Sequence, residues 1–535
     1  MPEAPRDPSR SDGTAAEQRW ADTMGEAHPP TIPSAKLAES SCDNGRGAEQ
    51  VPPLGGSMPK ACGLRSAERS GAGTGPQGRG CEAPEKQVII AVLAVRDARY
   101  YIDCSRQPGW PWQRTTLLSF NEIADQLCVK EGMPFLPVQK ALRSIPERID
   151  ETATAEHFGR PPEAWQLLHE QVNNRLSAAA TRLKFWRRLL AIESLLRDRR
   201  HIPVVQELGG FASILALRAW CRLAGTPHLS MEPGMFPGRL LFTRDSFFVD
   251  ILGIRPDDMA IAKANQARRA FLAQPAFLMP EKDQLFFRAA SLGKILSMDF
   301  LSRFWNKFSR AFLLRRTEEF SAIRPQTVEQ LRRLLRSRRL RGSYSIPAQN
   351  SRFIYYPLHV PWDVQLTFRC PQCFDQMKLL ERLTAALPDG WTVVTKEHPA
   401  AVGSYDVEPL RRLVAGRRLV LAPPHLNSLV LARQAQAVVT VNSKVGFESL
   451  MAGLPVITLG ASFYRGAGLT TDVETPEQAV AAAVAGAARP DEERLGRFLG
   501  TCWAATVPGE LYTADAAKLA TSAAGFASAA KLLET

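Results

Sequence analysis

The sequence VTVNSKVGFESLMAGLPVITLG, residues 439–460, combines two apolar strands with a short helix between them. The first strand is expected at residues 437–441 and the second at residues 455–459. Residues 445–452 have the apolar spacing of a helix. A strand, a helix and another strand in this order predict a βαβ unit with parallel strands.

The same alternation extends on both sides of this unit. We expect strands at residues 353–358, 391–397 and 418–422, and helices at 374–387, 408–414, 428–434 and 476–487. Strands separated by helical segments predict a parallel sheet with right-handed crossovers. We therefore assign residues 344–535, which end in an Ala-rich helix, to a C-terminal Rossmann-like domain.

Residues 87–343 are predicted to form an N-terminal α/β domain with extra helices. A buried strand is expected at 87–95 and a strand–helix–strand unit at 202–207, 210–224 and 227–231; helical patterns cover 163–200 and 299–341. Residues 1–86 are rich in Gly, Pro, Ser and Ala without apolar periodicity, so we expect a disordered tail.

Composition and cysteine usage favour an ordinary globular protein in a reducing compartment. The chain has 535 residues, 45% of them hydrophobic, and none of its apolar runs approaches the roughly 20 residues of a membrane span. Nine scattered cysteines do not suggest a disulfide framework. Cys370 and Cys373 form a CxxC without a second ligand pair, so we expect no metal there. A cytoplasmic location is expected.

The net charge of +13 belongs to the folded part of the chain, because residues 1–86 hold ten Lys or Arg and twelve Asp or Glu. A basic body favours an anionic partner such as a membrane surface, a nucleotide-linked donor, an acidic glycan or nucleic acid. The sequence shows no zinc module, RNA-recognition signature or recognition-helix motif, so we expect no nucleic-acid partner.

Polar residues follow two of the predicted C-terminal strands, where ligands of open parallel sheets bind. One group follows the strand at 391–397 and the other follows the strand at 437–441. The predicted donor-binding residues are Lys396, His398, Pro399, Asn442, Ser443, Lys444, Gly446 and Glu448.

The second group precedes a helix, whose first amides and positive dipole end bind phosphate. Ser443 would cap this helix or donate its hydroxyl to the phosphate, and Lys444 would add charge. Gly446 would let the backbone approach closely, and Glu448 would accept hydrogen bonds from ribose hydroxyls. On these residues alone, simple capping by Asn442 and Ser443 is the commoner explanation.

His398 also has two interpretations. A histidine at a strand end can satisfy its own loop, whose backbone Pro399 restricts. Alternatively, it donates to a phosphate or gives a proton to a departing nucleotide, because an ordinary histidine titrates near neutral pH.

Taken together, these blocks resemble a known family. Residues 439–460, Phe463-Tyr464 and 468–470, with the blocks at 355–359 and 396–399, look like the capsule polysaccharide biosynthesis/export family, which includes the Kdo transferases of Gram-negative capsules. The resemblance covers about residues 200–245 and 350–475. It implies a GT-B architecture, in which two Rossmann-like domains face a cleft and the C-terminal one holds the donor.

The resemblance also implies a CMP-activated sugar, CMP-Kdo, a lipid-linked glycan acceptor and no metal or other cofactor. Bacterial sialyltransferases, which also use CMP donors, share a His-Pro motif and a later serine motif; His398-Pro399 and Ser443 would take those roles. This chain has Ser443-Lys444 where Ser-Ser or Ser-Thr is common. Other capsule-assembly proteins and the inner membrane would be partners.

Glycosyl transfer needs a carboxylate as base or nucleophile. Glu232 and Glu207 end the two N-terminal strands of the unit at 202–231 and are the candidates. Glu232 resembles the family's Glu-x-Gly block, although Pro233 replaces the Asp of some relatives. Alternatively, either glutamate caps a loop or binds an arginine such as Arg239.

Two basic segments, residues 182–190 and 330–341, mix arginines with aromatic or leucine side chains. They suit peripheral attachment to an anionic inner-membrane surface or, equally, a solvated helix face packed on the core.

Other functions share parts of this pattern. A UDP-sugar transferase or epimerase has the same fold and phosphate-binding helix. A non-catalytic capsule-assembly scaffold and a nucleic-acid-binding protein are the remaining alternatives.

Overall fold

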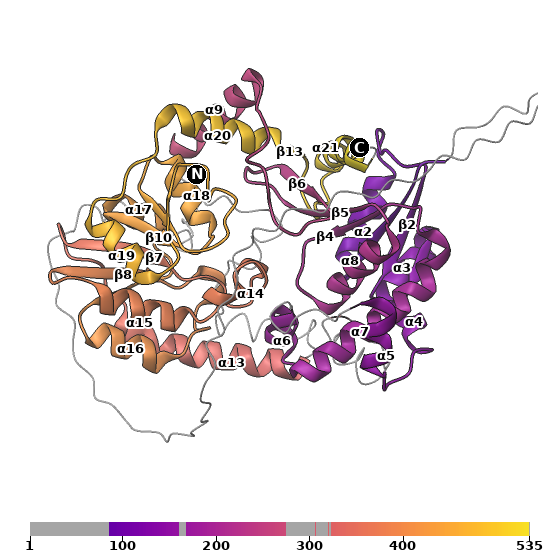
Figure 1. Ribbon diagram of the computed structural model, residues 1–535, viewed down its shortest axis with the longest axis horizontal. Coiled ribbons are helices and arrows are strands. Elements are labelled where there is room, and N and C mark those ends of the chain that lie inside the picture. The colour runs from indigo at the N-terminus through magenta and orange to yellow at the C-terminus, as the bar shows by residue number, and fades with distance from the viewer. Residues whose placement is uncertain (1–84, 160–166, 274–304, 306–318, 320–322, 534–535) are drawn as a thin grey trace, which may run out of the picture. The chain divides into compact units, whose positions relative to one another are not determined.

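The computed structural model describes residues 85–159, 167–273, 305, 319 and 323–533. Almost the whole predicted tail, residues 1–86, lies outside these ranges, as do residues 299–322 of the predicted helical region 299–341, except residues 305 and 319. Within them the chain forms two β-sheets, which we call the N-terminal sheet and the C-terminal sheet. Figure 1 shows both sheets with their helices.

The C-terminal sheet is parallel throughout its described strands, in the order β12-β11-β10-β7-β8-β9. The chain is wound from β7 to β9 on one side and then from β10 to β12 on the other, so the winding reverses between β7 and β10. The strands are β7 (Arg352–Pro357), β8 (Trp391–Lys396), β9 (Leu419–Ala422), β10 (Ala437–Thr440), β11 (Val456–Thr458) and β12 (Thr471–Asp472).

Helices cover both faces of this sheet. Their bounds are α13 (Ile323–Leu340), α14 (Val364–Thr367), α15 (Gln376–Ala386), α16 (Val407–Ala415), α17 (Ser428–Gln434), α18 (Lys444–Met451) and α19 (Pro476–Val484). Each strand and helix predicted between residues 353 and 487 is present within a few residues of its predicted bounds, so the sequence-based fold of this region is confirmed.

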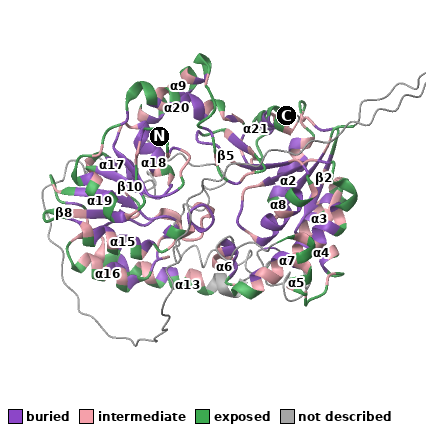
Figure 2. Ribbon diagram, in the orientation of Figure 1, coloured by how far each residue is buried: buried purple, intermediate pink, exposed green. Residues whose placement is uncertain are grey.

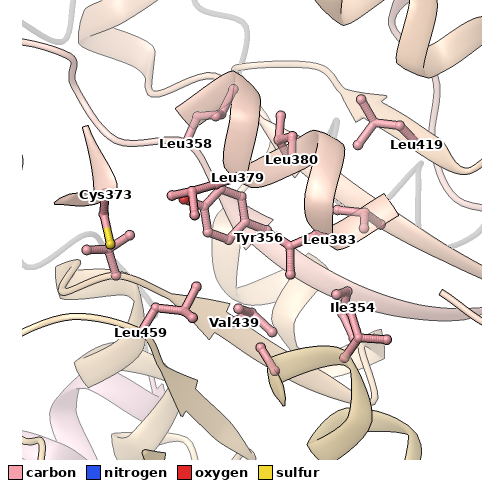
Figure 3. Close-up of a cluster of buried hydrophobic side chains, with 14 of the residues drawn as sticks. Ile354, Tyr356, Leu358, Cys373, Leu379, Leu380, Leu383, Leu419, Val439 and Leu459 are labelled. Carbon is pink, nitrogen blue, oxygen red and sulfur yellow. The ribbon is translucent and has the colours of Figure 1, made fainter. Parts of the chain in front are cut away.

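Alternate side chains of β7 explain why its sequence is apolar along its whole length. Ile354 and Tyr356 join the core under α15, as Figure 3 shows, whereas Phe353 and Tyr355 join the core under α17 and α18. Strands covered on both faces bury most of their side chains, and Figure 2 shows the strands of this sheet as largely buried.

The N-terminal sheet has the order β13-β6-β5-β4-β1-β2-β3. From β3 to β5 the strands are parallel, and β6 is antiparallel to β5. Its strands are β1 (Gln87–Val92), β2 (Arg114–Ser119), β3 (Phe135–Pro137), β4 (Val204–Glu207), β5 (His228–Pro233), β6 (Arg239–Arg244) and β13 (Thr506–Pro508).

Most helices of this region lie around the parallel strands. They are α2 (Val95–Ser105), α3 (Glu122–Glu131), α4 (Val138–Leu142), α5 (Glu151–Phe158), α6 (Leu168–Asn174), α7 (Ala178–Leu196) and α8 (Ala212–Ala224). Helix α9 (Asp258–Ala273) packs against α20 (Glu492–Ala504) instead. The predicted strand–helix–strand unit is present as β4, α8 and β5, and two Rossmann-like sheets confirm the predicted GT-B-like α/β fold class.

The end of the chain differs from the predicted domain boundary. After α20 (Glu492–Ala504), strand β13 pairs antiparallel with β6, and α21 (Ala516–Ala530) packs against β13 and α2. Residues from 506 onward therefore complete the N-terminal sheet, although the sequence analysis assigned all of 344–535 to the C-terminal domain. A strand of three residues has too little local pattern to predict such a return.

We predict that Gly525→Ala destabilises the protein by about 1–3 kcal/mol, because overpacking costs this much. A Cβ at Gly525, inside α21, would overlap the Pro508 carbonyl oxygen of β13. The control is Gly496→Ala in α20, where the added Cβ would lie 3.7 Å from the Asn265 side chain, an ordinary contact. Since alanine is the better helix former, the control should stabilise slightly in urea unfolding. Equal effects of the two substitutions would contradict the docking of α21 on β13.

Candidate functional site

The carboxyl ends of β10, β7 and β8 bring the two predicted groups to one edge of the C-terminal sheet. Strand β7 lies between the other two, so the loops of His398 and Ser443 are separated by about 10 Å, twice the usual strand spacing. The loop after β7, which begins at Leu358 and contains His359, lies between them. The sheet therefore gathers the predicted residues within the length of one nucleotide without placing them in direct contact.

His398 is oriented by its own loop. Its Nδ1 accepts a hydrogen bond of 3.2 Å from the Ala400 N–H, as the cap of a short helical turn, Pro399–Ala401. In the neutral ring this leaves the proton on Nε2. Burial, and then the charge of Lys396, lower the pKa of His398 to about 4. The ring is thus a neutral hydrogen-bond donor at pH 7, which favours the predicted phosphate contact over the predicted proton transfer.

The loop that carries His398 is held from two further elements. The Glu397 carboxylate accepts from the Gly403 N–H at 2.9 Å and from the Tyr344 hydroxyl at 2.7 Å. Burial raises the pKa of Glu397. The guanidinium of Arg333, in α13, donates to the Ala400 carbonyl at 2.6 Å. These contacts fix the geometry of the strand end before any ligand arrives.

His359 is a site residue to which the sequence analysis gave no role. It is 6% exposed, and its Nε2 has no hydrogen-bond partner among the described residues. Burial, with a smaller effect of the neighbouring His398, lowers the pKa of His359 to about 4. A buried polar atom without a partner costs about 1–3 kcal/mol, so such atoms usually mark a bound ligand or water. Its position directly after a predicted strand was the signal that could have identified it.

Asn442 presents a second unsatisfied atom at the same edge. Its Nδ2 donates to the Gln365 carbonyl at 2.7 Å, whereas its Oδ1 finds no hydrogen-bond donor within the described ranges. The side chain is 6% exposed. The unpartnered Asn442 Oδ1 and His359 Nε2 therefore flank the point where the winding of the sheet reverses, which is where open α/β sheets bind ligands.

Ser443 precedes α18, but its hydroxyl does not cap the described helix. The Oγ lies 2.8 Å from Thr440 Oγ1 instead, and the Tyr464 hydroxyl donates to the Ser443 carbonyl at 2.9 Å. The alternative of simple side-chain capping by Ser443 is therefore wrong. The first amides of α18 and its positive dipole end face the carboxyl edge, as a phosphate site requires.

Gly446 has a packing function that the sequence analysis did not predict. A Cβ at this position would overlap the Tyr464 hydroxyl and lie 2.9 Å from Thr440 Cγ2. The glycine therefore lets α18 pack against Tyr464 and β10, and the structure gives no direct indication that the absent side chain admits a phosphate.

Lys396 and Glu448 are buried at this edge, with 2% and 5% of their surfaces exposed. The Lys396 Nζ donates to the Leu426 carbonyl at 2.5 Å. Burial lowers the pKa of Lys396 to about 8, and the opposite charge of Glu448 partly offsets that effect. Lys396 therefore carries its positive charge below about pH 8, while Lys444, at the start of α18, is exposed.

Glu232 forms an ion pair with an arginine. The sequence analysis considered such a pair but named Arg239 as an example of the partner. Both of its carboxylate oxygens bind the Arg369 guanidinium, at 2.5 and 3.1 Å, rather than Arg239. Arg369 is 8% exposed and also donates to the Phe247 carbonyl. Both carboxylate oxygens are already engaged by the guanidinium, so this geometry does not favour the predicted role of Glu232 as base.

Glu207, the second predicted carboxylate, lies at the carboxyl end of β4 in the N-terminal sheet. Its Oε2 accepts a hydrogen bond from the Tyr512 hydroxyl. A small pocket lies beyond the neighbouring strand β5; it is lined by residues 233–240, Lys444 and Glu510. This pocket joins the start of α18 to the loop that follows Glu232.

The basic segment at residues 182–190 is internal to the fold. Phe185 and Trp186 are 3% and 1% exposed, and Lys184 lies 2.9 Å from Glu170. Arg188 donates to Glu319 at 3.1 Å. The predicted contact of this segment with a membrane is wrong, because its aromatic side chains and several of its charges are already used within the protein.

We predict that Glu232→Gln lowers the free energy of unfolding by about 1–3 kcal/mol, because it leaves the charge of Arg369 buried without its counter-ion. The control is Glu408→Gln in the exposed pair with Arg339, whose side chains are 62% and 60% exposed. Exposed pairs contribute little, so the control should change stability by less than about 0.5 kcal/mol. Urea denaturation measures both; equal effects would show that the Glu232–Arg369 pair is not a stabilising contact.

Known proteins are similar in sequence to the part of the chain that contains the site residues of the C-terminal sheet. Residues 315–495 match a family model described as "Capsule polysaccharide biosynthesis protein". Protein FixF of Sinorhizobium fredii is 32% identical over 158 residues, which are 28% of this chain and 37% of FixF. The capsule polysaccharide modification protein LipA of Neisseria meningitidis is 26% identical over 132 residues, 25% of this chain and 19% of LipA. The chain thus spans a minor part of these relatives.

Solved structures that align with this chain have lower sequence identity. The Thermosulfurimonas dismutans KpsC β-Kdo 2,7 transferase has a TM-score of 0.31 and 18% identity, covering 58% of this chain and 79% of that one. The Neisseria meningitidis UDP-GlcNAc 2-epimerase has a TM-score of 0.27 and 10% identity, with coverage of 78% and 97%. Similarity at this level carries no conclusion about activity. The sequence similarity is therefore limited to residues 315–495, which resemble the capsule polysaccharide biosynthesis proteins.

Proposed function

We propose that the protein is a glycosyltransferase of capsular polysaccharide biosynthesis that transfers a sugar, Kdo from CMP-Kdo, to a lipid-linked glycan. The observation that carries this proposal is the carboxyl edge of the C-terminal sheet. There the unpartnered His359 Nε2 and Asn442 Oδ1 flank the reversal point of the sheet, beside the start of α18.

The residues of this edge suit a departing nucleotide. The first amides of α18 and the exposed Lys444 would hold the phosphate, whose negative charge increases as the bond to the sugar breaks. The neutral His398 would donate from Nε2 to a phosphate oxygen. Lys396 and Glu448 lie buried at the same edge, where Lys396 adds positive charge below about pH 8. Preorganised donors and charges of this kind stabilise a leaving group by electrostatics.

The choice of CMP and Kdo rests on the sequence blocks. The His-Pro pair at 398–399 and the serine at 443 resemble the CMP-binding motifs, and the family match covers both. The UDP-sugar alternative has the same fold, so the base and the sugar have to be identified by experiment.

Peripheral attachment to an anionic inner-membrane surface is part of the proposal and now rests on α13 alone. Three of its arginines form hydrogen bonds with other residues of the chain: Arg333 with the His398 loop, Arg336 with Asp406 and Arg339 with Glu408. The exposed side chains on the remaining face are Val328, Leu331, Arg332, Leu335 and Arg338. Among the described helices, none combines the length and apolar character that a bilayer crossing requires.

We predict that CMP raises the melting temperature of the protein by several degrees and that UDP does not, because a ligand that binds the folded state stabilises it. The His359→Phe variant should lose most of this shift, since it removes the unpartnered Nε2. The control is His228→Phe: His228 is 1% exposed, and its Nε2 likewise has no partner among the described residues, but it begins β5 in the other sheet. Equal protection by UDP, or an unchanged CMP shift in His359→Phe, would contradict the proposed site.

We further predict that the protein converts CMP-Kdo and a lipid-linked glycan into CMP and a glycan extended by one or more Kdo residues, detected by mass spectrometry. His398→Ala should lower the rate at least about 100-fold, as expected when a donor to developing charge is removed. If the wild type makes no product, and the wild type and His398→Ala support capsule assembly equally well, the protein is a scaffold instead.

A further inference from the structure

The N-terminal sheet has its own reversal point, between β1 and β4. From β1 the chain runs to β2 and β3 on one side, and β4 and β5 follow on the other. Helix α2 begins three residues after β1, and Glu207 is the last residue of β4. The same rule that locates ligands in the C-terminal sheet therefore draws attention to the start of α2 and the end of β4.

Two carboxylates meet at this point. Asp97, in the first turn of α2, is 7% exposed, and its Oδ2 accepts from the backbone N–H groups of Leu93 and Ala94 at 3.2 and 3.0 Å. Burial, and then the negative charge of Glu207, raise the pKa of Asp97 to about 6. Arg96 lies 3.8 Å from Asp97 and opposes this rise.

The Tyr101 hydroxyl is the observation that points to a ligand. Tyr101 lies one helical turn after Asp97 and is 0% exposed, yet its hydroxyl has no hydrogen-bond partner in the part of the chain that the structure describes. It is close enough to Glu207 and Asp97 for their charges to raise its pKa further, after burial and Tyr100. A buried hydroxyl that lies near two carboxylates and has no partner can still form a hydrogen bond with a hydroxyl group of a ligand.

The segment after β13 completes the arrangement. The Tyr512 hydroxyl donates to Glu207, and the Arg96 guanidinium lies 4.3 Å from the centre of the Tyr512 ring. Two residues before Tyr512, Glu510 lines the pocket that also contains Lys444 of α18. Residues 510–512 thereby link the carboxylates of Asp97 and Glu207 to the pocket beside α18.

We propose that Asp97, Tyr101, Glu207 and Tyr512, here called the acceptor cluster, bind a hydroxyl of the acceptor glycan and that the Asp97–Glu207 pair takes its proton. This inference rests on the proposed function. The acceptor O–H proton passes to a carboxylate, and the oxygen forms a bond to the anomeric carbon of the donor sugar. The bond from that carbon to the phosphate oxygen breaks, and its electron pair leaves with the nucleotide.

The electrostatics of the acceptor cluster suit a base better than those of Glu232. Two carboxylates that repel one another retain a proton to higher pH, and a pKa of about 6 is near the value at which a base works best in neutral solution. The groups that face Asp97 are Glu207, Tyr101, Tyr512 and Arg96. Activity should therefore rise with pH through about 6, as Asp97 loses its proton.

Asp97→Asn and Tyr101→Phe test this proposal. Asn can still accept the N–H groups that Asp97 caps but cannot take a proton, so we expect kcat to fall about 100- to 10,000-fold and the acid limb near pH 6 to disappear. Tyr101→Phe should raise KM for a Kdo-glycerolipid acceptor about tenfold, because one hydrogen bond to it is lost. The shift in melting temperature with CMP should stay at the wild-type value in both variants.

Tyr100→Phe is the matched control. Tyr100 is 1% exposed, and its hydroxyl also lacks a hydrogen-bond partner within the described residues, but the charges that raise its pKa are those of Cys104 and Glu510. It should leave KM unchanged. If Tyr101→Phe also leaves KM unchanged, or if Asp97→Asn transfers at the wild-type rate, the acceptor cluster is structural.

Equilibrium binding of the same Kdo-glycerolipid, measured by calorimetry without donor, separates this inference from the proposed function. Binding to wild type and Tyr100→Phe that weakens about tenfold in Tyr101→Phe supports the acceptor cluster even if CMP does not bind. Absence of CMP binding would overturn the proposed donor site. Failure of wild type to bind the acceptor, or equal binding by all three proteins, would overturn the acceptor cluster.

Discussion

Hydrogen bonding of β7 to parallel strands on both sides, β8 and β10, is the constraint on which the candidate site depends. Because the strands are parallel and the connections are helical, all three strands must end at one edge of the sheet. The middle strand must also be covered on both faces, which accounts for the alternating burial of Phe353 to Tyr356 in two separate cores. The polar residues of the site follow at the first positions where the backbone leaves this sheet.

The sequence predicts this half of the fold well because every strand between residues 353 and 459 is apolar and separated from the next by a helix. It predicts the other sheet less well, for local reasons. Strand β2 reads RTTLLS and begins with polar residues, while β3 and β13 have three residues each. The pairing of β13 with β6 joins segments more than 260 residues apart, which a local pattern cannot reveal.

Positions of site residues were predictable from strand ends, but their roles depend on partners distant in sequence. His398 and Ser443 lie where expected, yet the first is kept neutral by burial and the hydroxyl of the second is turned toward Thr440. Glu232 binds Arg369, 137 positions later. Asp97 follows an apolar strand and has the sequence of an ordinary helix start, so its proximity to Glu207 becomes apparent only when β1 and β4 are adjacent.

The return of the chain to the N-terminal sheet has a consequence for synthesis. A ribosome makes β1 to β6 first, but β6 gains its outer neighbour, β13, only after the whole C-terminal sheet has emerged. Domains generally fold in the order in which they are made. The N-terminal sheet therefore has an unpaired edge at β6 while the C-terminal sheet forms. Tyr512 reaches Glu207 in the same final step. Nascent chains that stall before residue 506 would thus have a complete C-terminal sheet and an incomplete N-terminal sheet, the form most exposed to chaperones and proteases.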